Sequence, residues 1–160
     1  PAGSPLRRLY NWDPLVDFIG AVLDRPTLYR LADPLGACSI NVFRPGGLHA
    51  WHFDEAPYST TLMLQAAEAG GFFEYVPHLR TGDGAEHDAV GRILDGEEGA
   101  VRRLPFAAGT LSIFAGHVSM HRVTELGGGR LRLVAVLAFH GKPGVTNSAE
   151  VRRLFWGRTK

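Results

Sequence analysis

The sequence has very little cysteine, since Cys38 is the one thiol in 160 residues. A single cysteine cannot form an internal disulfide, so the fold depends on its core, and a reducing cytoplasm is the default location. Cys38 stands in the apolar run GACSINVF. We expect a buried and inert thiol there.

An excess of charge and a long apolar run are also missing. Seventeen Lys and Arg against sixteen Asp and Glu leave a net charge of +1, which gives no electrostatic footprint for nucleic acid. No run approaches the roughly 20 residues of a membrane-spanning helix, and the first residues lack the pattern of a signal peptide. We therefore expect neither a nucleic-acid partner nor a membrane.

The chain suits a single domain over residues 1–160, because hydrophobic residues make up 45% of it, enough for one core. It opens on PAGSPLRRLYNWDPL, without Met, and enters a helical pattern almost at once. We expect that N-terminal residues of a longer protein precede this segment.

Apolar periodicity predicts one helix followed by short strands. Residues 13–25 have apolar side chains at helical spacing, with Asp13 as the expected N-cap and Pro14 at the first helical position. Residues 81–104 are polar and rich in glycine, with one helical patch at 89–94, and are expected to leave the sheet. Strands are expected at 27–36 (strand or turn), 37–44, 59–65, 70–76, 109–116, 121–126 and 130–140.

The order of these elements indicates the fold class. Short strands separated by Gly and Pro, with one helix at the start, favour a β-sandwich or barrel with helical support. A parallel α/β fold needs helices between its strands, and the segments leave little room for them. The strands at 121–126 and 130–140 are separated by three glycines and are expected to form a hairpin.

A possible metal site begins at HAWHFD, where His52 and Asp54 are two residues apart. In a strand, residues at this spacing share a face, so one imidazole and one carboxylate can bind the same divalent metal. We expect His121 as third ligand, with His117 as the alternative. Two His and one carboxylate form the facial triad of non-haem Fe(II) enzymes. An isolated His-x-Asp is more commonly a surface ion pair.

The other histidines are not part of a recognisable metal-ligand motif. We expect His49, His78, His87 and His140 at the surface or in loops.

The wider pattern strengthens the metal interpretation. The segments NVFRPGGLHAWHFD, TTLMLQ, GGFFEYVP, GTLSIFAGHVSMHRVTEL and GGGRLRLVAVLAF, within residues 41–139, together resemble the Fe(II)/2-oxoglutarate-dependent oxygenases. More narrowly, they are similar to the branch that contains free-amino-acid hydroxylases and radical halogenases. The resemblance implies a mainly β, double-stranded β-helix (jelly roll, cupin-like) with a supporting N-terminal helix.

The resemblance also implies a chemistry. Fe(II), 2-oxoglutarate and O₂ would be the cofactors, and His52, Asp54 and His121 the catalytic metal ligands. Halogenases of this branch have Gly in place of the carboxylate, which frees a coordination position for chloride. Because Asp54 is present, the resemblance implies a hydroxylase acting on a small molecule, with a free amino acid as the expected class.

The far carboxylate of 2-oxoglutarate needs a cation, and Arg can bind it as a planar fork. Arg130, nine residues after His121, fits the family offset and is our first choice; Arg132, on the same predicted strand face, is second. Either side chain can instead lie at the solvated end of the strand.

One position departs from the family. Many relatives have a Tyr nine residues before the first metal histidine, where this chain has Phe43. We expect Asn41 and Gln65, on neighbouring strands, to provide the missing hydrogen bonds, although both can simply be polar residues at strand ends.

Four residues are candidates for substrate contacts. Arg44 would bind a substrate carboxylate, Glu55 or Glu74 an ammonium group, and Trp156 would close over the substrate. The alternatives are a solvated turn for Arg44, a backbone partner for Glu55 and an anchoring role for Trp156.

Two other functions remain open at this point. One is a cupin-like metalloenzyme that does not use 2-oxoglutarate, and the other is a non-catalytic jelly-roll module that binds a ligand or partner.

Overall fold

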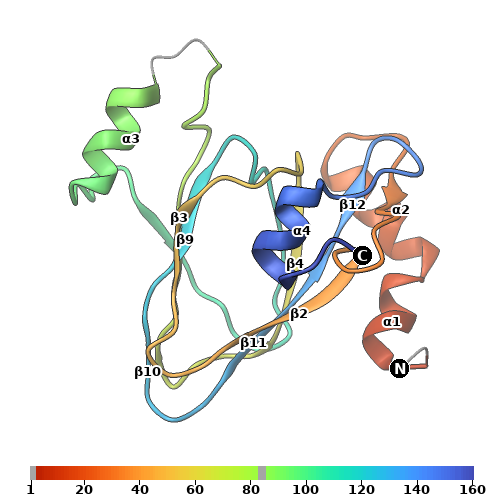
Figure 1. The fold of residues 1–160 in the computed structure, drawn as a ribbon, viewed down its shortest axis with the longest axis horizontal. Coiled ribbons are helices and arrows are strands. Elements are labelled where there is room, and N and C mark those ends of the chain that lie inside the picture. The colour runs from red at the N-terminus through yellow and green to blue at the C-terminus, as the bar shows by residue number, and fades with distance from the viewer. Residues whose placement is uncertain (1–2, 83–85) are drawn as a thin grey trace.

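The computed structural model describes residues 3–82 and 86–160. Two four-stranded antiparallel sheets form the walls of a flattened barrel, which meet near β10 and diverge toward the opposite end (Figure 1). This is the double-stranded β-helix, or jelly roll, so the expected fold class is confirmed.

The first sheet lines the wall beside the N-terminal helices. Its inner face carries small and polar residues, such as Ser39 and Asn41, whereas the alternate residues Ile40 and Val42 face outward and are exposed. The strand order is β2 (Cys38–Phe43), β11 (Arg132–Leu137), β4 (Ser59–Gln65) and β8 (Leu111–Phe114).

The second sheet carries both histidines of the expected triad. His52 at the end of β3 is directly opposite His121 on β9, so the register places the two imidazoles side by side. Phe73 and Val123 on the same inner face pack against Phe114 of the first sheet. The strand order is β3 (His49–His52), β9 (Met120–Val123), β6 (Phe73–Val76) and β7 (Arg102–Leu104).

The expected hairpin of residues 121–126 and 130–140 is wrong. β9 pairs with β3 and β6, whereas β11 pairs with β2 and β4 in the other sheet. The chain crosses between the sheets through β10 (Leu126–Gly127), which pairs with β5 (Ala69–Gly70). A glycine-rich turn between two strands looks the same in sequence whether the strands pair or change sheet.

Two N-terminal helices, α1 (Pro5–Tyr10) and α2 (Asp13–Val22), pack outside the first sheet. Their apolar face supplies Tyr10, Leu15 and Ile19 to a core cluster that also contains Leu137 and Phe139. The helix predicted at 13–25 is therefore present, but Asp13 is not its N-cap. Trp12 has that position without a capping side chain, and the Asp13 carboxylate accepts a hydrogen bond from Arg30 at 2.8 Å.

The polar excursion predicted at 81–104 contains more structure than its sequence indicates. Helix α3 (Glu86–Leu94) packs Ile93 against Val76 and Met120 on the outer face of the second sheet. The excursion then ends in β7, which was not predicted because its residues, including Arg102 and Arg103, are charged and exposed. Residues 83–85 of the excursion lie outside the described residues.

The C-terminal helix α4 (Ala149–Trp156) lies across the space between the sheets (Figure 1). Ser148 caps it, and Gly157 ends it in the left-handed conformation, at φ 65°. Asp33, in the loop between β1 (Tyr29–Arg30) and β2, accepts hydrogen bonds from Arg152 Nε at 2.7 Å and Asn147 N at 3.0 Å. A buried carboxylate thus anchors α4 over the barrel.

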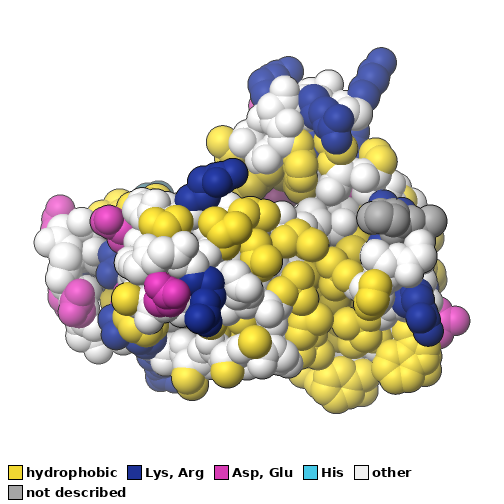
Figure 2. All heavy atoms as spheres, turned by 90° about the horizontal axis from the view of Figure 1, so that it is seen from below, with side chains coloured by type: hydrophobic (Ala, Val, Ile, Leu, Met, Phe, Trp, Pro, Cys, Tyr) yellow, Lys and Arg dark blue, Asp and Glu magenta, His cyan; other side chains and the backbone are white. Residues whose placement is uncertain are grey.

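Apolar side chains also lie on the outside of the protein. Figure 2 shows them gathered over a broad area of the face seen from below. Ile40 and Val42 on β2 and Leu64 on β4 are among the exposed large hydrophobic residues. Of the helices in the described ranges, none is both long and apolar enough to span a bilayer.

Candidate metal centre

A cavity of about 510 Å³ lies between the two sheets and beneath α4. Residues from both inner faces and from α4 line it, and most of this lining is apolar. Its size and its few convergent polar groups are typical of a small-molecule site.

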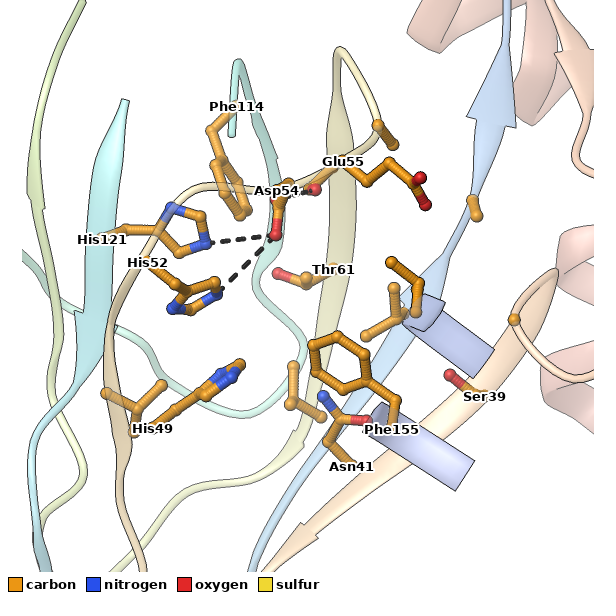
Figure 3. A pocket seen from close by; sticks show the side chains of 18 of the residues that line it. Ser39, Asn41, His49, His52, Asp54, Glu55, Thr61, Phe114, His121 and Phe155 are labelled. Carbon is orange, nitrogen blue, oxygen red and sulfur yellow. Dashed lines mark hydrogen bonds and ion pairs between the residues drawn. The ribbon is translucent and has the colours of Figure 1, made fainter. Parts of the chain in front are cut away.

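Three side chains at the second-sheet wall converge on one point. One donor atom each from His52, Asp54 and His121 lies within 4.8 Å of the other two. His121 Nε2 is 3.5 Å and His52 Nε2 is 3.7 Å from Asp54 Oδ1, and Figure 3 shows both imidazoles pointing toward that carboxylate. Ligands at about 2.1 Å from one metal are about 3 Å apart when adjacent, so a small inward movement completes a metal site.

Both imidazoles are held in the tautomer that a metal needs. His52 Nδ1 donates to the carbonyl of Ala50 at 2.8 Å, and His121 Nδ1 donates to the carbonyl of Ser119 at 2.9 Å. A backbone carbonyl only accepts, so the proton lies on Nδ1 and the lone pair on Nε2 faces the cavity. Burial, followed by the neighbouring His121, lowers the pKa of His52 and so favours its neutral form.

Asp54 follows β3 and lies in a loop, so strand alternation alone does not position it. Ser59 Oγ donates to Asp54 Oδ2, which leaves Oδ1 facing the histidines. The Asp54 amide donates to Gly116 O at 3.1 Å, and His117 Nδ1 donates to the Asp54 carbonyl, also at 3.1 Å. Burial opposes ionisation, but His121, Ser59 and His52 together hold the pKa of Asp54 below its ordinary value.

Gly116 is required beside this carboxylate. A Cβ atom at position 116 would overlap Asp54 Oδ2. His117, the alternative third ligand, binds the backbone of Asp54 and is not one of the three converging residues. It therefore supports a ligand and leaves the third position to His121.

His49 was expected at the surface or in a loop, and this is wrong. Its ring lies 3.9 Å from that of His52, centroid to centroid, and it lines the cavity. Burial, followed by the nearby His52, lowers the pKa of His49 to about 4. His49 and His52 both lie in the short strand β3. Residues three apart point to opposite faces of a regular strand, so the sequence pattern did not predict that these two histidines share the site. The pairing of β3 with β9 shifts register between these two residues.

A buried cation lies on the inner face of the first sheet. Arg132, at the start of β11, is 2% exposed, and its Nε and Nη1 atoms are buried without a hydrogen-bond partner among the residues that the structure describes. Its guanidinium lies 5.1 Å from the ring centroid of Phe43, and it lines the cavity. Burial lowers the pKa of Arg132 to about 10. An unpaired buried guanidinium is costly unless an anion joins it.

Arg130, our first choice for the cosubstrate carboxylate, lies elsewhere. Arg130 lies in the turn before β11, and its side chain is 56% exposed. Its Nε is 3.8 Å from Glu68 Oε1. The offset of nine residues from His121 does not bring it inside, because residues 127–131 cross between the sheets before β11 begins. The order of preference between the two arginines is therefore reversed.

The two residues expected to compensate for Phe43 differ in position. Asn41, on the inner face of β2, lines the cavity (Figure 3). Gln65, at the end of β4, donates to the carbonyl of Leu131 at 2.9 Å and is not among the cavity-lining residues.

Two of the four substrate candidates line the cavity. Glu55 lies in the loop after Asp54 (Figure 3) and accepts a hydrogen bond from the backbone N–H of Ser148, the N-cap of α4, at 3.5 Å, so its expected alternative, a backbone partner, is present. Trp156 contributes to the wall formed by α4. Arg44 is exposed in the turn after β2 and does not line the cavity. Glu74 is also absent from the lining, because it faces the outer side of β6 and binds Arg103 and Arg122.

Several lining residues had no signal in the sequence. Ser59, Thr61 and Phe114 occupy strand positions that read as ordinary β-sheet, and Arg80 and Phe155 occupy segments that resemble solvated loop and tail. Only the packing of the two sheets and of α4 brings them to the same cavity.

Solved structures show the same fold. AviO1 from Streptomyces viridochromogenes matches at a TM-score of 0.67 and 19% identity, over 91% of this chain and 64% of that one. An oxidoreductase of the 2OG-Fe(II) oxygenase family from Burkholderia pseudomallei matches at 0.53 and 17%, over 90% and 55%. HygX from Streptomyces hygroscopicus, solved with iron bound, matches at 0.51 and 15%, over 95% and 76%. The chain thus spans about 64% and 55% of the first two relatives.

Two comparisons of the sequence with known proteins gave different results. None of the curated proteins matches this chain significantly. A family model does match, over residues 2–154, which is nearly the whole chain. The chain belongs to the Halogenase D (HalD) family.

Proposed function

We propose that this protein is an Fe(II)- and 2-oxoglutarate-dependent oxygenase that hydroxylates a small molecule, with a free amino acid as the substrate class. One observation carries the proposal: a two-histidine, one-carboxylate cluster and a buried, unpaired arginine line the same cavity. The cluster suits Fe(II), and the arginine suits the far carboxylate of 2-oxoglutarate.

The chain's own residues prepare the metal site. His52 and His121 offer Nε2 because backbone carbonyls hold Nδ1, and Asp54 offers Oδ1 because Ser59 holds Oδ2. These three ligands, all from one side, would leave the metal accessible to cosubstrate and O₂. When bound there with 2-oxoglutarate, Fe(II) supplies the activation of O₂ that allows oxidation of an unactivated C–H bond.

Arg132 is the residue we assign to the cosubstrate. It faces the cavity from β11, and a guanidinium can present two N–H groups to one carboxylate as a planar fork. Phe43 lies under the guanidinium and cannot donate a hydrogen bond, so the amide of Asn41 is the neighbouring side chain able to do so.

Hydroxylation is favoured over halogenation by Asp54, despite the family name. A halide bound to the metal would need a coordination position, and the Asp54 carboxylate would take the one beside His52 and His121. Ser59 and Gly116 fix that carboxylate tightly, so it has little freedom to withdraw for chloride.

Aromatic side chains form part of the cavity walls. Phe114 lies beside the triad and Phe155 lies across the cavity from it (Figure 3), and Trp156 adds to the same α4 wall. Such apolar walls protect the substrate from side reactions with solvent. Glu55 also lines the cavity; one carboxylate oxygen accepts a long bond from Ser148 N, and the other is the one we assign to an ammonium group.

The test measures coupled turnover. The anaerobically purified protein is loaded with Fe(II) and 2-oxoglutarate, mixed with each member of an amino-acid panel and exposed to O₂. We expect succinate and a product 16 Da heavier than one panel member. Asp54→Ala should lose this turnover, and the His78→Ala variant, which changes an exposed histidine, should retain it.

Other outcomes decide among the alternatives. Bound iron without any use of 2-oxoglutarate would favour a cupin-like metalloenzyme. A protein that neither binds iron nor forms succinate would favour a ligand- or partner-binding module. A chlorinated or brominated product in the presence of halide would contradict the role given to Asp54.

A further inference from the structure

The charged residues of the cavity lining can be assigned one by one. Asp54 belongs to the metal site and Arg132 to the cosubstrate, as proposed above. Besides the histidines, Arg80 and Glu55 are the charged residues of the described lining that these two roles leave over. A basic and an acidic group therefore remain for the substrate.

Arg80 is held near the metal end by two contacts. Its guanidinium carbon lies 4.0 Å from the ring centroid of Phe53, the residue between His52 and Asp54. Its Nη1 donates to the carbonyl of His117 at 2.9 Å, and His117 in turn binds the backbone of Asp54. These contacts fix the plane and the position of the guanidinium without neutralising its charge.

No carboxylate within the described residues pairs with Arg80. By contrast, Arg103, Arg122 and Arg152 each bind an acid, and each of these pairs stabilises the fold. A guanidinium has five N–H donors, and the bond to His117 uses one of them. Arg80 is thus a half-buried, oriented cation that retains donors for an anion.

We propose that Arg80 binds the carboxylate of the substrate, in the role first expected for Arg44. Arg44 is exposed in a turn and does not line the cavity, whereas Arg80 does. Glu55, on the same cavity, then faces the opposite charge of the substrate. The pair selects a zwitterion and rejects the corresponding carboxamide, which lacks the negative charge.

This inference rests on the proposed function for its chemistry, but binding tests it without turnover. The protein is kept anaerobic with Fe(II) and 2-oxoglutarate, and binding is measured by ligand-observed NMR. The probes are the common free amino acids and the same amino acids as carboxamides. We expect at least one free acid to bind and its carboxamide to bind about 10- to 100-fold more weakly.

Two variants assign the effect to a residue. Arg80→Gln should weaken binding of the free acid by about 10- to 100-fold and leave the weak carboxamide binding unchanged. Arg80→Lys should restore part of the loss, because it returns the charge but not the planar fork. Arg44→Gln is the matched control and should bind both probes as the wild type does.

Four results would overturn the inference: equal binding of acid and carboxamide, unchanged acid binding in Arg80→Gln, a loss in Arg44→Gln instead, or no binding by any panel member. The succinate assay is scored separately. Acid-selective, Arg80-dependent binding without succinate would contradict the proposed function and leave the subsite standing. Succinate formation without acid-selective binding would support the proposed function and contradict the role given to Arg80.

Discussion

Two buried charges, one in each four-stranded sheet, have opposite surroundings. Glu74 on β6 is 4% exposed, and its carboxylate accepts bonds from Arg103 at 2.6 Å and Arg122 at 2.7 Å. Arg132 on β11 is 2% exposed and has two buried nitrogens without partners. The protein itself compensates the first charge, whereas the second faces the cavity without a partner for these nitrogens among the described residues.

The direction of each charge explains this difference. Glu74 faces the outer side of the second sheet, where Arg122 of the neighbouring strand β9 is directly opposite it. Arg132 faces the cavity, opposite Phe43. The comparison teaches that a buried charge marks a binding site when its partners are missing, and a structural contact when they are present.

Removing Arg132 should have the largest effect on function. Replacing it by Met retains the aliphatic stem and should raise the KM for 2-oxoglutarate about 100-fold, because the bidentate contact is lost. The free energy of unfolding without 2-oxoglutarate should fall little, since no internal partner loses a bond. Succinate formation and urea unfolding measure the two quantities.

Arg130→Met is the matched control, two residues away on the exposed turn. It should leave the KM for 2-oxoglutarate within about twofold of the wild type. A large rise in this KM for Arg130→Met, with none for Arg132→Met, would restore our first choice from the sequence.

Gly116→Ala extends the comparison to Asp54, an acid that needs its partners in order to bind a metal. The added methyl group would overlap Oδ2 and displace the carboxylate from Ser59 and the histidines. We expect Fe(II) affinity to fall about 10- to 100-fold, as is typical when support of a ligand is lost. Gly91→Ala, at an open position of α3, is the control. Equal Fe(II) dissociation constants for the two variants would contradict the tight fit.

Glu74→Gln tests the buried charge that the protein compensates with its own side chains. The variant loses the charge that Arg103 and Arg122 bind, and the free energy of unfolding should fall by about 1–3 kcal/mol. Because both arginines are partly exposed, at 56% and 32% of their side chains, water replaces some of the lost interaction. The KM for 2-oxoglutarate should not change. A change in this KM without a change in stability would place Glu74 in the site.

The smallest effect is on the pH dependence of stability. Burial opposes ionisation of Glu74, but Arg103 and Arg122 hold its pKa below the ordinary value of 4.5. The folded state therefore binds protons less readily than the unfolded state, so the contribution is complete above pH 4.5 and is lost as the pH falls through the folded pKa. Urea unfolding of the wild type should weaken more steeply below this pH than that of Glu74→Gln. Parallel curves would show that the carboxylate contributes nothing.

Much of the fold was predictable because it depends on local pattern. The alternation in STTLMLQ predicts β4 to the residue, and the apolar spacing of residues 13–25 predicts α2. The metal triad was also predictable as a candidate, because residue type and order identify it without any knowledge of strand pairing. The chain's membership of an oxygenase-type fold and of the HalD family agrees with the resemblance inferred from the sequence.

The parts that failed depend on long-range geometry. Arg130 and Arg132 share a predicted face, and only the point at which β11 begins decides which one is buried. His49 enters the site through an irregularity in the pairing of β3 with β9. Arg80 reaches the cavity from a loop, and nothing in the residues around it distinguishes that loop from a solvated one.

The anchoring of α4 by Asp33 has a dynamic consequence. α4 has no buried residue of its own, although its side chains form a wall of the cavity. Its attachment includes the Asp33 carboxylate, which binds Arg152 and the Asn147 amide, a long bond from Ser148 N to Glu55, and the ring contact of Phe155 with His49. An element with so little buried surface opens more readily than the barrel, so its amides should exchange with deuterium first. Access to the cavity can then be gained by local detachment of α4 while both sheets stay folded.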